Sequence, residues 1–334
     1  MTDPIRDLLS RKPVLFADGA MGTSLFALGL ETGDNPELWN VDHPDRVAEV
    51  HQGFVEAGSD IVLTNSFGGN ARRLMLHQLQ GRVGELNRAA AEVARNVADK
   101  AGRKVLVAGS IGPTGDIMAP VGVLSIEEAE EAFAAQAEAL KEGGVDLLWI
   151  ETISAMDELT AAIAGAARTG LPIVATLTFD THGRTMMGVT TAEAATLAAG
   201  LPVPPVAIGA NCGIGPSQLL ESVLGLVAAA GPEAIVVAKG NAGIPQYRAG
   251  HIHYDGSPEV MADYAALARD AGARIIGGCC GNTAAHIRAM VEAVETRPRR
   301  DPPSLEAVVA ALGPLTAPAK ADGEERRERK RRRG

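Results

Sequence analysis

The chain contains only three cysteines, Cys212, Cys279 and Cys280, and two of them are adjacent. Cys212 ends the apolar run "AIGANC", and the adjacent pair ends "RIIGGCC". Three thiolates around one point form a soft ligand set for Zn²⁺ and leave a fourth coordination position open. Two other interpretations compete with a zinc site. Buried cysteines are often inert small hydrophobes, and "GGCCGNT" before a helix could be a phosphate cradle that leaves the cysteines unexplained.

A closed structural zinc site would need a fourth Cys or His ligand close to the other three. His286 lies six residues beyond Cys280, on the helix expected to follow, and we expect it to face away. An odd number of cysteines without a disulfide-rich pattern is typical of a reducing, cytoplasmic protein. The sequence therefore favours an open zinc site that accepts a substrate as its fourth ligand.

Short apolar runs recur along the chain, and each ends in glycine or a polar residue. Such continuous, β-branched runs of four to six residues are typical of buried parallel strands. Helical patterns separate most of them. The clearest covers 125–144, with Ser125 as N-cap, Glu128 in a capping box and Gly143 as the stop, and a second covers 257–272. The eight predicted strands cover 14–19, 61–66, 105–110, 147–152, 173–178, 207–212, 235–241 and 274–280.

Eight strand–helix units in about 300 residues predict a (β/α)8 TIM barrel, an α/β fold in which catalytic residues follow the carboxyl ends of the strands. A doubly wound sheet is the second choice, because "DGAMGT" lacks the spacing of a dinucleotide fingerprint. The cysteines end strands six and eight, which a closed barrel brings close together. The polar residues at the eight strand ends are Asp18, Asn65, Ser110, Glu151, Thr178, Cys212, Asn241 and the Cys279–Cys280 pair.

Composition and charge limit the domain organisation and the partners. We expect one barrel over residues 1–300, a short helix and linker over 301–319, and a disordered charged tail over 320–334. The tail carries a net charge of +4 and the rest of the chain −14, and an acidic body argues against nucleic acid as a partner. The apolar runs are too short and interrupted to span a membrane, and the N-terminus lacks the apolar segment of a signal peptide. Oligomeric state is left open, a homo-oligomer included.

Seven motifs in residues 13–293 resemble the zinc-dependent homocysteine S-methyltransferases. That family includes betaine–homocysteine methyltransferase and the homocysteine-binding module of cobalamin-dependent methionine synthase. The pairing of "GANC" with "GGCCG", in this order and separation, is the most specific part of the resemblance. The motifs are "DGAMGT" (18–23), "TNSFGGN" (64–70), "GSIGPTG" (109–115), "IET" (150–152), "GANCGIGP" (209–216), "GNAGIP" (240–245) and "GGCCGNT" (277–283).

The resemblance implies a TIM barrel in which Cys212, Cys279 and Cys280 bind Zn²⁺ and L-homocysteine is methylated to methionine. It also implies that the positions of Asp18 and Glu151 hold the amino acid end of homocysteine. The zinc would deprotonate the homocysteine thiol, whose pKa is otherwise about 8.5. We further expect backbone amides around Gly19 and Asn65 to hold the substrate carboxylate.

The methyl donor is less clearly indicated. Betaine-using relatives hold the quaternary ammonium with one Trp and two Tyr, and Trp39 matches the Trp, whereas Gly69 and Thr152 occupy the tyrosine positions. Tyr247 could substitute for a missing ring. "TFDTHGRTMMG" and "GNAGIPQY" are more similar to the methionine synthase module, which receives its methyl group from a corrinoid. We therefore favour a methyl-corrinoid protein acting in trans, as in a split methionine synthase, with betaine or another small onium donor as the alternative.

Two other classes of function are less well supported. An aldolase or isomerase barrel would need a lysine at the barrel mouth, and Lys239 near the end of the seventh strand is the obvious candidate. A non-catalytic zinc-binding barrel is the remaining alternative. Metal analysis of the purified protein separates both from a zinc-dependent methyltransferase.

Overall fold

The computed structural model describes residues 3–180, 183–244, 246–248 and 251–315 of the chain. Its main sheet contains eight parallel strands, each within one residue of the predicted start. The first two strands are shorter than predicted, because the chain turns out of the sheet before Asp18 and Asn65. The strands are β1 (Leu15–Phe16), β2 (Ile61–Leu63), β3 (Leu106–Ile111), β4 (Leu147–Ile153), β5 (Ile173–Leu177), β6 (Ala207–Cys212), β7 (Val236–Gly240) and β10 (Ile275–Gly278).

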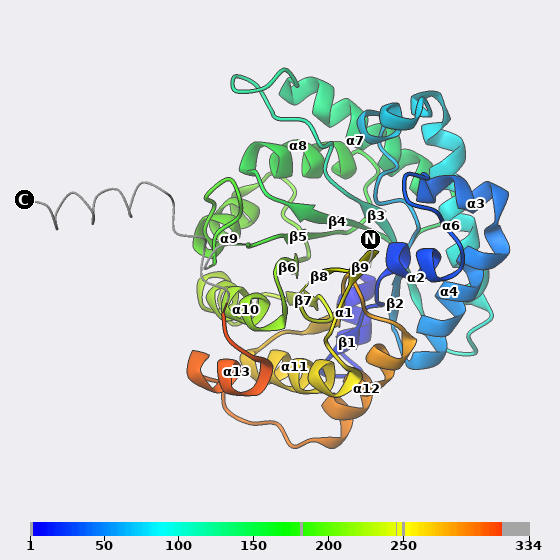
Figure 1. The fold of residues 1–334 in the computed structure, drawn as a ribbon. Helices are drawn as coiled ribbons and strands as arrows, with labels where there is room; N and C mark the ends of the chain where they lie inside the picture. The colour runs from blue at the N-terminus through cyan, green and yellow to red at the C-terminus, as the bar shows by residue number, and fades with distance from the viewer. Residues whose placement is uncertain (1–2, 181–182, 245, 249–250, 316–334) are drawn as a thin grey trace, which may run out of the picture.

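The strands form a nearly closed barrel. Their order is β1-β10-β7-β6-β5-β4-β3-β2, and a parallel bridge between Ala17 and Ile61 connects the two end strands. Figure 1 shows the strands at the centre of a ring of helices. The predicted (β/α)8 TIM barrel is therefore confirmed. β6, β7 and β10 are neighbours, as expected for the predicted sixth, seventh and eighth strands.

Helices follow the strands and cover the outside of the barrel. The helices packed around the sheet are α4 (Pro44–Ala57), α6 (Val83–Asp99), α7 (Ile126–Glu142), α8 (Met156–Ala167), α9 (Thr191–Gly200), α10 (Pro216–Ala230), α11 (Pro258–Ala271) and α12 (Ala284–Thr296). The short helix α2 (Met21–Ala27) packs against α4 at the barrel mouth. The remaining elements are α1 (Pro4–Leu9), α3 (Trp39–Asp42), α5 (Ala71–Leu74), α13 (Leu305–Leu312), three 3-10 turns (Pro36–Leu38, Met75–His77 and Gln80–Arg82) and an antiparallel hairpin of β8 (Gln246–Arg248) and β9 (His251–His253).

The predicted capping residues begin and end the helices. The Ser125 side chain accepts from the Glu128 backbone and the Glu128 side chain accepts from the Ser125 backbone, so the capping box of α7 is confirmed. Ser257 caps α11, which starts at a proline and ends before Gly272 in a left-handed conformation. These local signals fix where each connecting helix starts, and with it the length of the loops at the barrel mouth.

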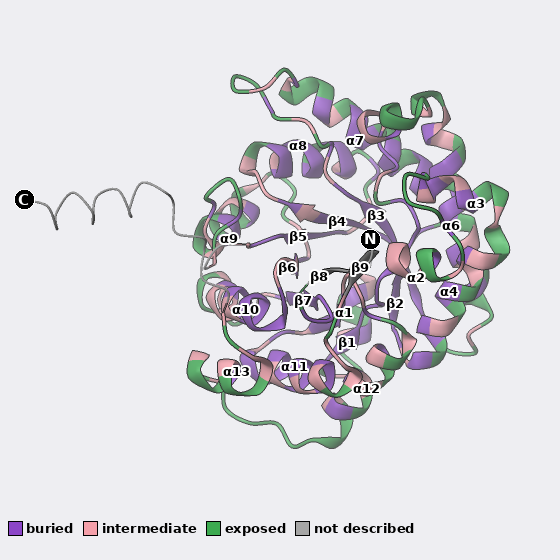
Figure 2. Cartoon of the chain, in the orientation of Figure 1, coloured by how far each residue is buried: buried purple, intermediate pink, exposed green. Residues whose placement is uncertain are grey.

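Two apolar layers stabilise the barrel. One fills its interior and includes Leu15, Trp149 and Val237, and Ile5 and Leu8 of α1 close the end at which the strands begin. The larger layer lies between the strands and the helices. In Figure 2 the strands and the sides of the helices turned toward them are mostly coloured as buried. Since α1 closes one end, the opposite end, where the strands finish, is the one available for a ligand.

The regions beyond the barrel are only partly described. Within 301–319, residues 305–312 form α13, which Ser304 caps. The predicted disordered tail, 320–334, lies outside the described residues. Within the described part of the chain, no helix has the length and apolar character needed to cross a lipid bilayer.

Candidate functional site

The three cysteines meet at the carboxyl end of the barrel. Cys212 is the last residue of β6, and Cys279 and Cys280 directly follow β10, with β7 between the two strands. Their three Sγ atoms all lie within 4.8 Å of one another. The predicted convergence of residues 67 positions apart is thus confirmed. In the described part of the chain, one group of His, Cys, Asp or Glu side chains is close enough together to hold a metal ion. It consists of Cys212, Cys279 and Cys280.

The backbone holds these sulfurs in place. Cys212 has φ of +63°, a left-handed conformation that costs a non-glycine residue about 1–3 kcal/mol and is typical of functional sites. The Cys279 N–H donates to the Gly240 carbonyl at 2.7 Å, which joins the end of β10 to the end of β7. Glycine is required at position 278, because a Cβ there would lie 2.4 Å from the Cβ of Asn282. The glycines therefore allow close backbone packing beside the cluster.

The proximity of the thiols changes their acidity. Hydrogen bonds from the Cys212 and Cys279 thiols lower the pKa of Cys280 to about 3. Hydrogen bonds with Cys279 and with Cys280 raise the pKa of Cys212. The cluster thus contains a thiolate at neutral pH, the form of cysteine that binds soft metal ions.

A buried ion pair and a second carboxyl group lie next to the sulfurs. Lys239 Nζ donates to Asp18 Oδ1 at 3.1 Å, and the Leu63 N–H donates to Asp18 Oδ2 at 2.7 Å. Burial raises the pKa of Asp18, and Lys239 opposes that shift. Glu151 accepts from the Ser110 hydroxyl at 2.6 Å. Burial raises the pKa of Glu151 to about 7, with Lys239 lowering it and Cys279 raising it.

A cavity of about 400 Å³ connects these groups. Its lining includes the predicted residues Asp18, Gly19, Asn65 and Glu151 together with the three cysteines. The Asn65 side-chain amide donates to the Pro36 carbonyl and to Asn40 Oδ1, so both of its side-chain N–H groups are engaged within the protein. Within the described residues, the backbone N–H groups of Asn65 and Gly19 donate to no protein acceptor. Volume and lining are typical of a site for small molecules.

Trp39 is the predicted site residue that the structure does not place in the cavity lining. Its side chain is 7% exposed and belongs to the core between strands and helices. The ring packs edge-on against His43 at 4.9 Å and lies 5.0 Å from the Arg46 guanidinium. Its position is that of an anchor for the segment before α4. His286 also points elsewhere, since its Nε2 lies 2.9 Å from the Gly256 carbonyl oxygen.

Sequence reasoning missed three aromatic residues of the lining. Phe26 on α2, Phe67 after β2 and Tyr254 after β9 all line the cavity, and the two phenylalanine rings are 48% and 37% exposed. No motif marked the phenylalanines, although Phe67 lies inside "TNSFGGN". The side chain of Tyr247, the ring suggested as a substitute, lies outside the described part of the structure.

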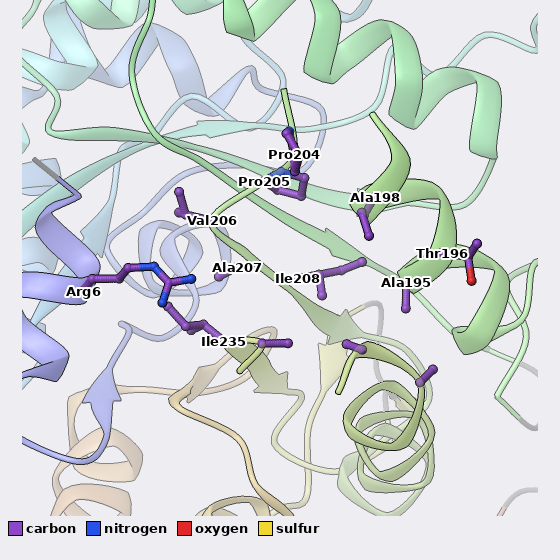
Figure 3. Close-up of a pocket in the computed structure, with 14 residues that line it drawn as sticks. Arg6, Ala195, Thr196, Ala198, Pro204, Pro205, Val206, Ala207, Ile208 and Ile235 are labelled. Atoms are coloured by element: carbon purple, nitrogen blue, oxygen red, sulfur yellow. The ribbon is translucent and has the colours of Figure 1, made fainter. Parts of the chain in front are cut away.

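A second hollow, at the other end of the barrel, lacks comparable chemistry. Figure 3 shows it between α9 and α10, at the start of β6, with Arg6 at one side. Its volume is about 510 Å³, and its lining consists of apolar side chains, Thr196 and Arg6. Arg6 is paired with Asp3 at 3.3 Å. The lining of this hollow has no Cys, His, Asp or Glu side chain, so the candidate site is the cavity at the cysteines.

Comparisons with known proteins agree with this geometry. The sequence model described as "Homocysteine S-methyltransferase" matches residues 15–294. The chain belongs to the homocysteine S-methyltransferase family. The match includes all eight barrel strands and the three cysteines.

Individual relatives agree with the family assignment. The chain is 33% identical over 327 residues to methionine synthase of Mycobacterium tuberculosis, which covers 92% of this chain and 27% of the relative. Methionine synthase of Mycobacterium leprae is 31% identical over 309 residues, and the match covers 88% of this chain and 25% of that relative. The chain thus spans about a quarter of the length of these relatives. The metallated form of the homocysteine methyltransferase MmuM from Escherichia coli has a TM-score of 0.71 and 28% identity, covering 86% of this chain and 99% of MmuM.

Proposed function

We propose that this protein is a zinc-dependent homocysteine S-methyltransferase that forms methionine. The observation that carries the proposal is the convergence of three cysteine sulfurs within 4.8 Å in a cavity that two carboxyl groups also line. In a tetrahedral zinc site with Zn–S bonds of about 2.3 Å, ligand sulfurs lie about 3.8 Å apart. The observed cluster fits that requirement with minor adjustment. The metallated form of MmuM supports metal binding in a related protein.

Each group of the site has a proposed task. A bound Zn²⁺ would supply a deprotonated homocysteine sulfur at neutral pH. Asp18 and Glu151 receive the substrate ammonium, and Glu151 does so best in its ionised form. The backbone N–H groups of Gly19 and Asn65 donate to the substrate carboxylate. These contacts fix the amino acid end, so that the substrate sulfur is aligned for an in-line displacement at the donor's methyl carbon.

The cavity favours a small onium compound as the methyl donor. Aromatic faces attract quaternary ammonium and related cations, and Phe26, Phe67 and Tyr254 supply three rings in the lining. A new sulfur–methyl bond would form while the donor's nitrogen–methyl bond breaks, and betaine would leave as a tertiary amine. The preference for a corrinoid donor rested on the missing rings at positions 69 and 152 and on two segments that are more similar to the methionine synthase module. The rings found elsewhere in the cavity weaken the first of these reasons.

A methyl-corrinoid protein acting in trans is the second candidate for the donor. It is favoured by the similarity to two proteins named methionine synthase, of which this chain spans about a quarter.

The three free cysteines further support a reducing, cytoplasmic location, because a disulfide among them would remove metal ligands.

The test compares donors with the same zinc-loaded protein and homocysteine. One reaction contains betaine, a second a trimethylsulfonium salt and a third a methylated corrinoid protein, and methionine is measured in each. We expect methionine with an onium donor alone. Methionine only in the corrinoid reaction would establish the second candidate, and none in any reaction, with zinc bound, would contradict the proposed activity. Cys212→Ala serves as the matched control without a complete metal site.

A further inference from the structure

The cavity lining contains one carboxyl group to which the proposed reaction gives no task, that of Glu37. Glu37 lies in the 3-10 turn before α3, and only 4% of its surface is exposed. The Gly68 N–H donates to Glu37 Oε1 at 2.6 Å. Among the described residues, no lysine, arginine or histidine forms an ion pair with this carboxyl group. Glu37 is therefore a buried acid without a counter-charge from the described protein.

The other buried carboxyl groups of the described residues have more partners than Glu37. Glu158, outside the cavity lining, accepts from both the N–H and the hydroxyl of Thr114. Glu151 is the one that matches Glu37, since it accepts a single hydrogen bond, from Ser110, and also lines the cavity. Three buried acids are paired with a lysine or arginine, namely Asp18, Asp60 and Asp270.

Burying a carboxylate is costly unless a cation or several hydrogen-bond donors compensate its charge. The two buried acids with the fewest protein partners, Glu37 and Glu151, both line the cavity. Glu151 is already assigned to the substrate ammonium. The cation that compensates Glu37 would then also come from a ligand, and it must be a second positive charge.

An aromatic residue adjoins the turn that binds Glu37. Phe67 directly precedes Gly68, whose N–H donates to Glu37, and it lines the same cavity. Glycine at position 112 lets the ring lie against the backbone after β3, because a Cβ there would be 2.7 Å from two ring carbons. The Gly112 N–H also donates to the Phe67 carbonyl at 2.9 Å. The ring is thus held by the protein, while 37% of the residue stays exposed.

A carboxylate and an aromatic face attract the same kind of ligand, a cation. An onium donor carries its positive charge before methyl transfer and loses that charge as the methyl group leaves. Contacts with the charge are therefore strongest before the reaction, so they improve donor binding and do not accelerate the chemical step. Burial raises the pKa of Glu37, and the backbone N–H groups of Glu37 and Gly68 and the charge of Arg73 oppose that shift. A bound cation further favours the ionised carboxylate.

We propose that Glu37 and Phe67 bind the positive charge of the methyl donor. Glu37 supplies the counter-charge, Gly68 positions its carboxylate, and Phe67 supplies one face of the cavity. The inference rests on the proposed function with an onium donor. It separates two cation sites in one cavity, with Glu151 at the homocysteine end and Glu37 at the donor end.

The test compares two ligands of the same shape that differ in charge. They are choline and 3,3-dimethyl-1-butanol, in which carbon replaces the nitrogen. Calorimetry on reduced, metal-free protein at pH 8 gives both affinities. The wild type should prefer choline about thirtyfold, about tenfold from the carboxylate and about threefold from an aromatic face.

Glu37→Gln removes the charge and keeps an oxygen that accepts from the Gly68 N–H. It should reduce the preference for choline to about threefold, the part that an aromatic face provides. Phe67→Leu keeps an apolar contact without the ring and should reduce the preference to about tenfold. The affinity for the neutral ligand should stay the same in Glu37→Gln, which shows that the cavity is still formed.

Glu158→Gln is the matched control. It makes the same change at a buried glutamate outside the cavity lining, and the amide oxygen can still accept both bonds from Thr114. We expect it to keep the full preference for choline. Equal affinities of the wild type for the two ligands, or an unchanged preference in Glu37→Gln, would overturn the proposal. A preference lost in Glu151→Gln and kept in Glu37→Gln would place the cation at the homocysteine end and overturn it as well.

Kinetics with a trimethylsulfonium salt connect this binding site to the reaction. In zinc-loaded protein with homocysteine, a sulfur–methyl bond forms on homocysteine and one in the donor breaks, so that dimethyl sulfide leaves with the electron pair. Glu37→Gln should raise the donor KM about tenfold and change kcat and the homocysteine KM less than twofold. A lower kcat with an unchanged donor KM would contradict the binding role. Absence of methionine with every donor would instead contradict the proposed function, whereas the choline preference is measured without metal or reaction.

Discussion

Replacing Lys239 by methionine should strongly destabilise the protein. Methionine keeps most of the apolar stem but removes the ammonium group, which is paired with Asp18 and lies 5.3 Å from the centre of the Trp149 ring. The exposed fractions of the two side chains are 3% and 2%, so water cannot replace the lost partner. Removing one partner of a buried ion pair costs about 3–5 kcal/mol, because the other charge is left uncompensated. We expect a loss of that size in the free energy of unfolding.

The pH dependence of the loss follows from the pKa of Asp18. Burial raises that pKa above its ordinary value of 3.8, and Lys239 is the main opposing charge. Without the lysine, folded protein holds the Asp18 proton to higher pH than unfolded protein does. Stability is then retained at low pH and falls as pH rises above the unfolded pKa. Lys239→Met should therefore be less destabilising at pH 5 than at pH 8.

The assay is equilibrium unfolding in urea, followed by circular dichroism on reduced, metal-free protein at both pH values. Asp18→Asn combined with Lys239→Met removes both charges and keeps an acceptor for the Leu63 N–H. The double variant should recover most of the loss, since a neutral pair can replace a buried ion pair at little cost. A loss below about 1 kcal/mol in the single variant, or a double variant as unstable as the sum of both changes, would refute the reasoning.

Three further predictions concern the proposed site. Cys212→Ala should abolish stoichiometric zinc binding in metal analysis, because only two of the three cysteine ligands remain. A full zinc content would exclude this cysteine as a ligand. Burial raises the pKa of Glu151 to about 7, so its ionised fraction falls from about one half at pH 7 to about one tenth at pH 6, and homocysteine affinity measured by calorimetry should fall about fivefold. Glu151→Gln should lose that contribution, and an unchanged pH profile would rule out an ion pair with the substrate ammonium. Trp39→Ala should cost about 3–5 kcal/mol in unfolding free energy, with a less than twofold change in the homocysteine KM; a selective KM increase would return Trp39 to the site.

The sequence was sufficient to predict the barrel because its signals are local and repeated. Continuous β-branched runs between capped amphipathic helices determine where strands and helices lie, and eight such units leave few alternatives for their arrangement. The ends of β1 and β2 were predicted less well. The Phe16 N–H bonds to the side chain of Asp60, and the Asp18 carboxylate accepts from Leu63. Those strand ends are thus set by side chains distant in sequence.

The cysteine cluster could be predicted for the same reason, since strands six and eight have one strand between them in any barrel of this order. The side-chain amides that donate to the sulfurs could not be predicted from the sequence. Asn211 and Asn241 donate to Cys279 and Cys212. Whether an amide reaches a sulfur depends on its rotamer, which a partner such as Thr152 fixes for Asn211. Lys239 was considered as a lysine for aldolase chemistry. Its ion pair with Asp18 became visible only when β1 and β7 were placed on the same barrel.

The donor question shows why counting residues at homologous positions is a weak argument for a binding site. The expected rings were sought at positions 39, 69 and 152. Trp39 lies in the core, and a side chain at Gly69 would meet the Asn87 amide at 2.4 Å, so no ring could occupy that position without displacing it. A cation does not distinguish which strand end supplies an aromatic face. It requires only that the faces surround its charge. Phe26, Phe67 and Tyr254 reach one cavity from three separate segments, and removing one ring tests whether they bind the donor. Phe26→Ala should raise the KM for an onium donor and leave homocysteine affinity unchanged, whereas a corrinoid-dependent enzyme would show no donor-specific change.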